Sequence, residues 1–203
     1  MSLMSVARLP DWLIPPSGGF VAEDLDRLPD LPPHTELIDG SLVFVSPQAS
    51  FHMRVLHLLA NALWACVPEQ YAVQREMTIK LGPRQRPEPD IMVTLTSAES
   101  GLEQTTFHAG DAVLVVEVVS EESQERDRKR KPSLYAEAGI MHFWRIEKVD
   151  SRAVVYVYEL DPADQVYALT GIHHDRLELT VPFAIDIDLT AIDRRPDGRD
   201  TGH

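Results

Sequence analysis

Two carboxylates beside apolar runs are the first residues of this sequence that could do chemistry. Asp90 directly precedes the run 91–93, and Glu117 lies near the end of the run 112–120, which is rich in valine. Such runs are typical of buried strands, where an unpaired charge is costly. A divalent metal ion shared by the two carboxylates would remove that cost. Alternatively, both lie just past a strand end and are solvated, and the local pattern leaves this open.

A run of basic residues follows Glu117 at a short distance along the chain. Such a run is usually the solvated end of a helix. Here, however, Asp127, Lys131, Leu134 and Ala138 are spaced by four, three and four positions, so on a helix they share one face. Because Leu134 and Ala138 should turn this face towards the core, we expect Lys131 to point inward near Glu117. The alternative is a solvated surface lysine.

The elements that would position these residues begin with a hairpin and a helix. Residues 35–45 flank Asp39-Gly40, the favoured pair for a type I′ turn. Apolar residues in 50–67 recur at helical spacing, and Ser50 is the expected cap. Alternation over 71–81 indicates a half-buried strand. The two apolar runs described above are the next predicted strands.

The second half of the chain is predicted to hold one helix and several strands. The helix covers 123–138, with Ser123 as its cap and Gly139 just past its end. Pro132 either kinks this helix or lies in the first turn of a regular part that starts near Lys131. The ranges predicted as strands are 141–146, 153–160, 166–169 and 177–181. This order indicates an α/β protein with a mixed sheet and a β-rich C-terminal part, without regular βαβ alternation.

Length and composition are those of one soluble globular domain. The chain has 203 residues, 44% of them hydrophobic and 25% charged. We expect an N-terminal arm at 1–20, a single domain at 21–192 and a disordered tail at 193–203. There is no run of roughly 18 apolar residues and no secretory signal, so no membrane association is expected. The single cysteine cannot form an internal disulfide, which favours a cytoplasmic location.

Charge and missing motifs exclude several classes of protein. The net charge of −13 argues against nonspecific coating of nucleic acid, although it permits an enzyme with a local basic surface. The sequence contains neither of the standard glycine-rich phosphate loops. It also lacks Cys-x-x-C and His-Glu-x-x-His, which disfavours a standard zinc site, and Gly-x-Ser-x-Gly, which disfavours an α/β-hydrolase.

A series of short motifs, in a fairly specific order and spacing, carries a family resemblance over about 21–189. The motifs are Glu36-Leu37-Ile38-Asp39-Gly40, His52 at the opening of a helix, Glu88-Pro89-Asp90, Val116-Glu117-Val118-Val119-Ser120, Asp127 to Lys131, Tyr135 to Gly139, and Phe143-Trp144. Together they resemble the Uma-two-type family of restriction-endonuclease-like proteins, which have a PD-(D/E)XK nuclease core. The resemblance implies a restriction-endonuclease-like mixed sheet flanked by helices. It also implies Mg²⁺-dependent cleavage of phosphodiester bonds.

The resemblance assigns roles residue by residue. Asp90 matches the aspartate of the Pro-Asp element, and Glu117 matches the acidic residue of (D/E)XK. Val119 stands where that element has its lysine. The family resembles nucleases whose lysine has moved to the following helix, and Lys131 occupies the matching position. Glu36 matches the upstream glutamate of the family.

The implied chemistry uses these residues as one set. Asp90 and Glu117 would hold Mg²⁺ or Mn²⁺, hard ions that prefer oxygen ligands, and the Val118 carbonyl could add another ligand. The metal would lower the pKa of its bound water and polarise the phosphate. Lys131 would orient the water or stabilise developing charge. Glu36 would hold a metal-bound water or tune the site, unless it is an exposed strand residue.

Two kinds of residue carry weaker expectations. His52 is either catalytic or, more commonly for a histidine at a helix start, a structural hydrogen-bonding residue. The aromatic residues Tyr135, Phe143 and Trp144 are expected in the core.

The expected function is that of a metal-dependent endonuclease acting on nucleic acid, with DNA as the expected substrate. A homodimer is expected because two sites cut a duplex most easily. One alternative is an inactive member of the fold that binds nucleic acid or protein, which a distant Lys131 would favour. Another is a hydrolase of small phosphoesters, which a small pocket in place of a long basic groove would favour.

Overall fold

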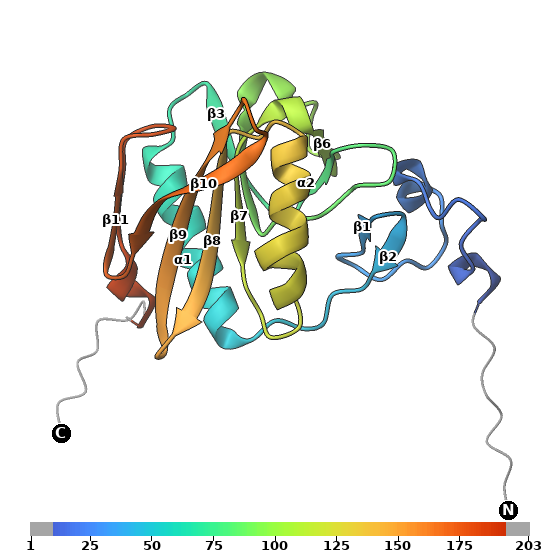
Figure 1. The fold of residues 1–203 in the computed structure, drawn as a ribbon, viewed down its shortest axis with the longest axis horizontal. Coiled ribbons are helices and arrows are strands. Elements are labelled where there is room, and N and C mark those ends of the chain that lie inside the picture. Colours follow the sequence, from blue (N-terminus) through green and yellow to red (C-terminus); the bar gives the residue numbers. More distant parts are fainter. Residues whose placement is uncertain (1–9, 194–203) are drawn as a thin grey trace, which may run out of the picture.

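The computed structural model describes residues 10–193 and is built on a six-stranded sheet with the order β10-β9-β8-β7-β5-β3 (Figure 1). Within this sheet β7 and β8 pair in parallel, and the other neighbours are antiparallel. The sheet is therefore mixed, as the sequence predicts. Its strands are β3 (Tyr71–Arg75), β5 (Ile91–Leu95), β7 (Ala112–Val118), β8 (His142–Val149), β9 (Arg152–Asp161) and β10 (Val166–His173).

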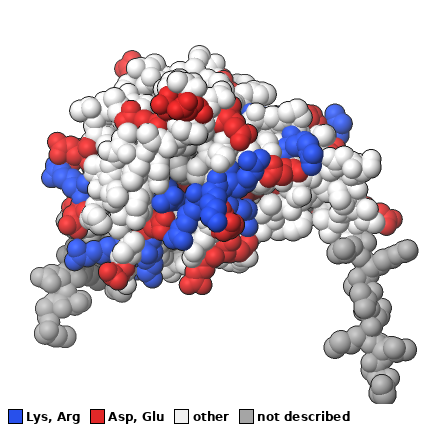
Figure 2. All heavy atoms as spheres, viewed as in Figure 1, with Lys and Arg blue, Asp and Glu red and all other residues white. Residues whose placement is uncertain are grey.

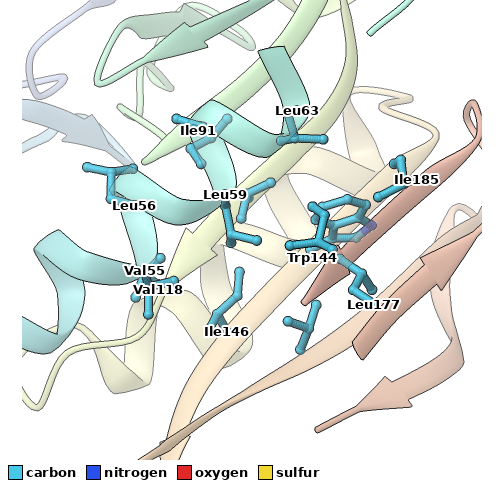
Figure 3. Packing of buried hydrophobic residues seen from close by; sticks show 14 of the residues in the cluster. Val55, Leu56, Leu59, Leu63, Ile91, Val118, Trp144, Ile146, Leu177 and Ile185 are labelled. Atoms are coloured by element: carbon cyan, nitrogen blue, oxygen red, sulfur yellow. The ribbon is translucent and has the colours of Figure 1, made fainter. Parts of the chain in front are cut away.

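One face of the sheet is covered by helix α1 (Ser50–Cys66), whose buried stripe is apolar from Val55 to Leu63. The hairpin of β11 (Arg176–Leu179) and β12 (Ile185–Asp188) closes the same core, together with η6 (Leu189–Asp193). Figure 3 shows this packing, with Trp144 of the sheet lying among side chains from the helix and the hairpin. Burial of this stripe explains why the helical periodicity was readable in the sequence.

The opposite face is covered by helix α2 (Lys131–Glu137), which lies in front of the sheet in Figure 1. Side chains alternate along β7: Val116 and Val118 join the core under α1, whereas Val115 joins the core under α2. Glu117 has the same parity as Val115. It therefore points from a buried strand towards α2.

A turn of π-helix, η5 (Arg126–Arg130), leads directly into α2. The N–H of Lys131 donates to the carbonyl of Arg126, five residues back. Pro132 follows as the second residue of α2. A proline ring there would meet the carbonyl four residues earlier in a regular helix, and the wider π turn relieves that contact. Of the two predicted alternatives, the one that starts the regular helix near Lys131 is confirmed.

The remaining elements are two small sheets and several short 3₁₀ helices. The predicted hairpin is confirmed: β1 (Glu36–Ile38) and β2 (Ser41–Val43) are joined by Asp39 and Gly40, whose φ angles of 53° and 77° suit a type I′ turn. A second small sheet pairs β4 (Thr78–Lys80) with β6 (Thr106–His108). The short 3₁₀ helices are η1 (Asp11–Leu13), η2 (Ala22–Asp26), η3 (Thr96–Ala98) and η4 (Ala109–Asp111).

Two local predictions were wrong. The single strand expected over 71–81 is two strands, β3 and β4, because the chain turns at Glu76, whose φ is 49°. Ser50 is the first residue of α1 and not its cap; Ala49 holds that position without a side-chain hydrogen bond. Strand β12 was not anticipated.

The ends of the chain need one adjustment. Phe20, which we expected in the N-terminal arm, is 5% exposed and packs with Ala22 and Leu37. It therefore belongs to the domain. Residues 1–9 of the expected arm and 194–203 of the expected tail lie outside the described residues. Within residues 10–193, no helix is long and apolar enough to cross a membrane.

Candidate active site

Lys131, the first residue of α2, is buried among three carboxylates. Its Nζ lies 2.8 Å from Glu36 Oε1, 3.0 Å from Glu117 Oε2 and 3.5 Å from Asp127 Oδ1. Only 4% of Lys131 is exposed, and the three carboxylate residues are each 2% exposed. The inward orientation predicted from the helical spacing is therefore confirmed. The lysine reaches the end of the Glu117 strand from a different element of the fold.

The other carboxylate oxygen of Glu117 is also engaged. The Tyr135 hydroxyl donates a short hydrogen bond to Glu117 Oε1, and Lys131 donates to Oε2. Tyr135 is fully buried, as predicted, but it is also part of the site. Glu117 is thus neither solvated beyond its strand nor bare within it, because two side chains of α2 compensate its burial.

Asp90, immediately before β5, lies on the far side of this cluster. Its Oδ2 accepts a hydrogen bond of 2.6 Å from the backbone N–H of Val118, which fixes Asp90 beside the strand of Glu117. Its Oδ1 lies 3.0 Å from His52 Nε2, from the first turn of α1. His52 is 4% exposed, and its Nδ1 has no hydrogen-bond partner among the described residues.

The β1–β2 hairpin positions Glu36 within the cluster. Backbone hydrogen bonds in both directions join Leu37 to Arg86, which fixes the hairpin against the segment before Asp90. The guanidinium of Arg86 is buried and donates to Ala22, Thr78 and Thr106, and it also pairs with Asp26. Glu36 Oε1 in turn accepts from the Glu88 N–H at 2.9 Å. Glu36 is therefore not the exposed strand residue of the alternative interpretation.

A pocket of about 430 Å³ opens onto the cluster. Its walls come from β1, the start of α1, the end of β7 and η5, and the loop before α1 closes one side. The charged side chains that line it are mostly acidic: Glu36, Glu76, Glu88, Asp90, Glu117, Glu122 and Asp127, against Lys131 and Arg126. Such a pocket attracts cations and repels anions unless a cation is bound.

Burial and mutual repulsion raise the pKa of two of the three carboxylates, Glu117 and Asp127. Burial raises the pKa of Glu117 well above its usual range, the neighbouring carboxylates add to this shift, and Lys131 opposes it. The pKa of Asp127 is raised for the same reasons. For Lys131, burial disfavours the charge, but Glu117, Glu36 and Asp127 together outweigh it and raise its pKa well above the usual range.

The pKa of His52 is also set by the balance between burial and neighbouring groups. Burial works against the protonated imidazole, but the Asp90 carboxylate and the Val118 backbone outweigh burial, so the pKa of His52 is raised. At the mouth of the pocket, burial raises the pKa of Glu88, and a short hydrogen bond with His34 opposes that shift.

The basic run contributes little free positive charge. Figure 2 shows lysine and arginine gathered on the face that carries α2, with acidic side chains beside them. Arg128 pairs with Glu147, Lys129 with Glu125, and Arg130 with Asp39 and Glu137. Arg126 also lies 3.7 Å from Glu122. The surface beside the site is therefore balanced in charge and is not a basic groove.

The donor chemistry of the site fits a hard divalent cation. Asp90 and Glu117 supply carboxylates on neighbouring strands, and Mg²⁺ needs only one or two carboxylates because it keeps several waters. The pocket also holds more carboxylates than cations. No three His, Cys, Asp or Glu side chains in residues 10–193 are grouped to hold an ion by themselves. To bind Glu117 and Asp90, a cation would therefore have to displace groups that now donate hydrogen bonds to these carboxylates.

All five residues predicted for the site line this pocket: Glu36, His52, Asp90, Glu117 and Lys131. The structure brings them together, while their roles remain proposals. Sequence reasoning missed Tyr135 and Glu88 as members of the site. The spacing of Tyr135, four residues after Lys131, could have placed it on the same helix face. Glu88 carried no such signal, because its contact with His34 depends on how the N-terminal segment folds back.

Comparison with known proteins identifies a family and several chains of similar structure. A family model described as "Uma2: Putative restriction endonuclease" matches residues 22–191. A crystal structure titled as that of "a putative nuclease belonging to DUF820 from Anabaena variabilis" has a TM-score of 0.65 and 17% sequence identity. The match covers 85% of this chain and 97% of that chain, and at this identity it shows a shared fold. Among curated proteins, none matches the sequence.

Proposed function

This chain belongs to the Uma2 family of restriction-endonuclease-like proteins, and we propose that it is a metal-dependent endonuclease that hydrolyses phosphodiester bonds of nucleic acid, with DNA as its substrate. One observation carries the proposal. Lys131 reaches Glu117 at 3.0 Å from the following helix, so a lysine stands beside this strand carboxylate although Val119 replaces the motif lysine. Burying a lysine in an acidic cluster costs desolvation that apolar residues would avoid, and this supports a functional role for Lys131.

The proposed roles follow from the positions of the side chains. Asp90 and Glu117, with the Val118 carbonyl, would hold Mg²⁺ or Mn²⁺, which supplies an acidified water and charge to offset the phosphate. Lys131 would orient the attacking water or stabilise the developing negative charge. Glu36 holds Lys131 at 2.8 Å and so fixes its ammonium group. His52 fixes Asp90, which supports a positioning role for this histidine.

The test is a cleavage assay on supercoiled plasmid, single-stranded DNA and RNA with added Mg²⁺ or Mn²⁺. We expect cleavage of at least DNA that chelation abolishes and that Glu117→Gln and Asp90→Asn lack. Arg152→Ala, which alters an exposed ion pair with Asp175 away from the pocket, is the matched control. Absence of cleavage of all three substrates by pure, folded wild type would contradict the proposal.

A second candidate, hydrolysis of a small phosphoester, is favoured by the shape and charge of the surroundings. The pocket is bounded, its walls are acidic, and the basic run beside it is paired with carboxylates. Long nucleic acids are usually bound through unpaired lysine and arginine. Bis(p-nitrophenyl) phosphate is a suitable probe. Hydrolysis of this diester by a protein that leaves plasmid intact would select the second candidate.

A homodimer stays a prediction, and β10 is the surface we propose for it. Among the described strands β10 is an edge of the central sheet, contains no Asp, Glu, Lys or Arg, and exposes Val166, Leu169 and Ile172 by about half. An uncharged edge is where two acidic copies can approach and pair antiparallel strands.

Light scattering at micromolar concentration tests this interface. We expect a dimer that Leu169→Lys or Ile172→Lys dissociates. Trp64→Lys is the control, because Trp64 is 60% exposed on α1, on the other side of the sheet. A monomeric wild type, or a dimer that survives both β10 changes, would contradict the proposed interface.

A further inference from the structure

The three carboxylates around Lys131 are not equivalent. Its Nζ lies at ordinary hydrogen-bond distance from Glu36 and Glu117, but 3.5 Å from Asp127 Oδ1, beyond the usual range. Asp127 Oδ1 is buried and has no hydrogen-bond partner within the described part of the chain. A buried acceptor without a donor destabilises the fold. The cluster therefore contains one carboxylate oxygen that is ion-paired with Lys131 but accepts no hydrogen bond.

Glu117 has two competing uses in the proposed function. As a ligand it must present an oxygen to a divalent cation, yet its Oε2 accepts from Lys131 and its Oε1 accepts from Tyr135. A lysine ammonium at that oxygen also repels an incoming cation. Lys131 is only 4% exposed, so a move from Glu117 towards the open pocket would leave its ammonium group with fewer buried partners. Another carboxylate within reach has to accept it.

We propose that Lys131 occupies the cation's place at Glu117 and is transferred to Asp127 Oδ1 when a divalent cation binds, with Asp127 acting as a positioning residue. The inference rests on the proposed metal-dependent function. Glu36 holds the ammonium at 2.8 Å and can serve as the pivot of the movement. After the transfer, the lysine charge remains beside the site, where it can act on substrate, while the Glu117 oxygen is free.

The helix geometry suits this role better than direct ligation by Asp127. Asp127 precedes Lys131 by four residues on the same helical segment and lies on the same face. To reach hydrogen-bond distance from Asp127 Oδ1, Lys131 Nζ has to move by about a few tenths of an ångström. A change of lysine rotamer can supply this movement while the backbone stays in place. By contrast, Asp127 does not join Asp90 and Glu117 in any described group of side chains that could hold an ion.

A double-mutant cycle separates transfer from ligation. Calorimetry with Mn²⁺ is carried out on wild type, Asp127→Asn, Lys131→Met and the double variant. We expect Asp127→Asn to weaken Mn²⁺ binding about tenfold, within the usual range of coupling between sites. Lys131→Met should strengthen Mn²⁺ binding, because the competitor is gone. In the Lys131→Met background, Asp127→Asn should change affinity by less than about twofold, since no lysine needs a new partner.

Two results overturn the transfer. Equal weakening by Asp127→Asn with and without Lys131 would make Asp127 a direct ligand, and no weakening in either background would make it irrelevant. Glu76→Gln is the matched control, because Glu76 lines the same pocket but has no ion pair with Lys131. Its effect on Mn²⁺ affinity measures the general loss of negative charge and should be the same in both backgrounds.

A measurement on folded wild type guards against variants that fail to fold. The chain has four lysines, so the ε-carbon signal of Lys131 can be assigned by NMR. Diamagnetic Mg²⁺ should shift this signal in wild type and shift it much less in Asp127→Asn; an unchanged wild-type signal at saturating Mg²⁺ overturns the transfer. If Mn²⁺ or Mg²⁺ binds but Asp127 and Lys131 are not coupled, only the lysine transfer is refuted. If neither ion binds, the proposed metal-dependent function is refuted as well.

Discussion

The two faces of the central sheet are sealed by helices in opposite ways. Under α1, the sheet buries hydrocarbon from Leu59, Val116 and Trp144. Under α2, an apolar core around Tyr135 is continuous with a charged cluster in which Lys131 contacts three carboxylates. The same strand, β7, supplies residues to both faces in alternation. The first face gains free energy from burial, whereas the second accepts a desolvation cost that apolar residues would avoid.

This contrast distinguishes the apolar core under α1, which stabilises the fold, from the charged cluster under α2, for which we propose a functional role. Apolar packing tolerates substitutions of similar size, because many contacts share the energy. A buried cluster of one lysine and several carboxylates tolerates little, since removal of any member leaves the others unpaired. The following predictions test whether the two faces differ in this way, and they run from the largest expected effect to the smallest.

The largest effect should be on cleavage by Lys131→Ala. We expect activity to fall by roughly 10²–10³-fold, as for the loss of one group that stabilises charge in a transition state. Lys131→Arg should retain little activity, because a planar guanidinium cannot replace a compact ammonium here. Leu59→Ala on the other face should keep wild-type turnover at a temperature where it remains folded. Equal cleavage by wild type and Lys131→Ala would refute the assignment of this lysine.

Stability should respond on both faces. Leu59→Ala removes a fully buried side chain and should cost about 2–5 kcal/mol. Lys131→Ala should cost about 3–5 kcal/mol near neutral pH, since it leaves buried carboxylates without their cation. Denaturant unfolding measures both. A cost for Lys131→Ala below about 1 kcal/mol would mean that the cluster is solvated more than its burial indicates.

The pH dependence of stability should distinguish the faces more finely. Because the pKa of Glu117 is raised in the folded protein, its contribution is fully present below its ordinary pKa and is lost as pH rises through the raised value. Glu117→Gln cannot ionise. The difference in unfolding free energy between wild type and Glu117→Gln should therefore move against wild type as pH rises from about 4.5. Leu59→Ala should show a pH-independent difference, and parallel curves for all three proteins would contradict the shift.

The smallest effect should come from the exposed pairs of the basic run. Arg130 pairs with Asp39 at the surface and holds the pKa of that carboxyl at about 2. Both side chains are more than one-third exposed, so Arg130→Ala should cost at most about 1 kcal/mol, and less at high salt. Thermal unfolding at two salt concentrations measures this. A loss above about 2 kcal/mol would show that the run has a structural role as great as the buried cluster.

The features that the sequence predicts well are those with a local cause. The hairpin at Asp39-Gly40 follows from backbone conformation, α1 from apolar periodicity, and β7 from its valines. The face that Lys131 shares with Leu134 follows from helical spacing, so the inward lysine was also accessible. Each of these depends on residues close together in the chain.

The features that could not be predicted depend on distant parts of the chain meeting. The break at Glu76 arises because β4 pairs with β6 instead of extending β3. The hydrogen bond from the Val118 N–H to Asp90, and the contact of Glu36 with Lys131, join segments far apart in sequence. Helical spacing places Tyr135 on the face of Lys131, but nothing local indicated that its hydroxyl would meet Glu117. Its hydroxyl matters because Glu117 happens to end beneath it.

The π turn η5 contains more residues per turn than the regular α-helix that follows it. A π turn holds one residue more than the same stretch of α-helix needs. Removing one residue between Asp127 and Lys131 would restore regular winding and leave the segment upstream in nearly the same orientation, because the wider turn absorbs the extra residue. Lys131, fixed by α2, would stay in place, and Asp127 would precede it by three residues, a spacing that still keeps both on one side of the helix. In evolutionary terms, a π turn lets a single inserted codon add a residue beside the lysine without changing how the flanking helical turns pack, and a single deletion can take it away.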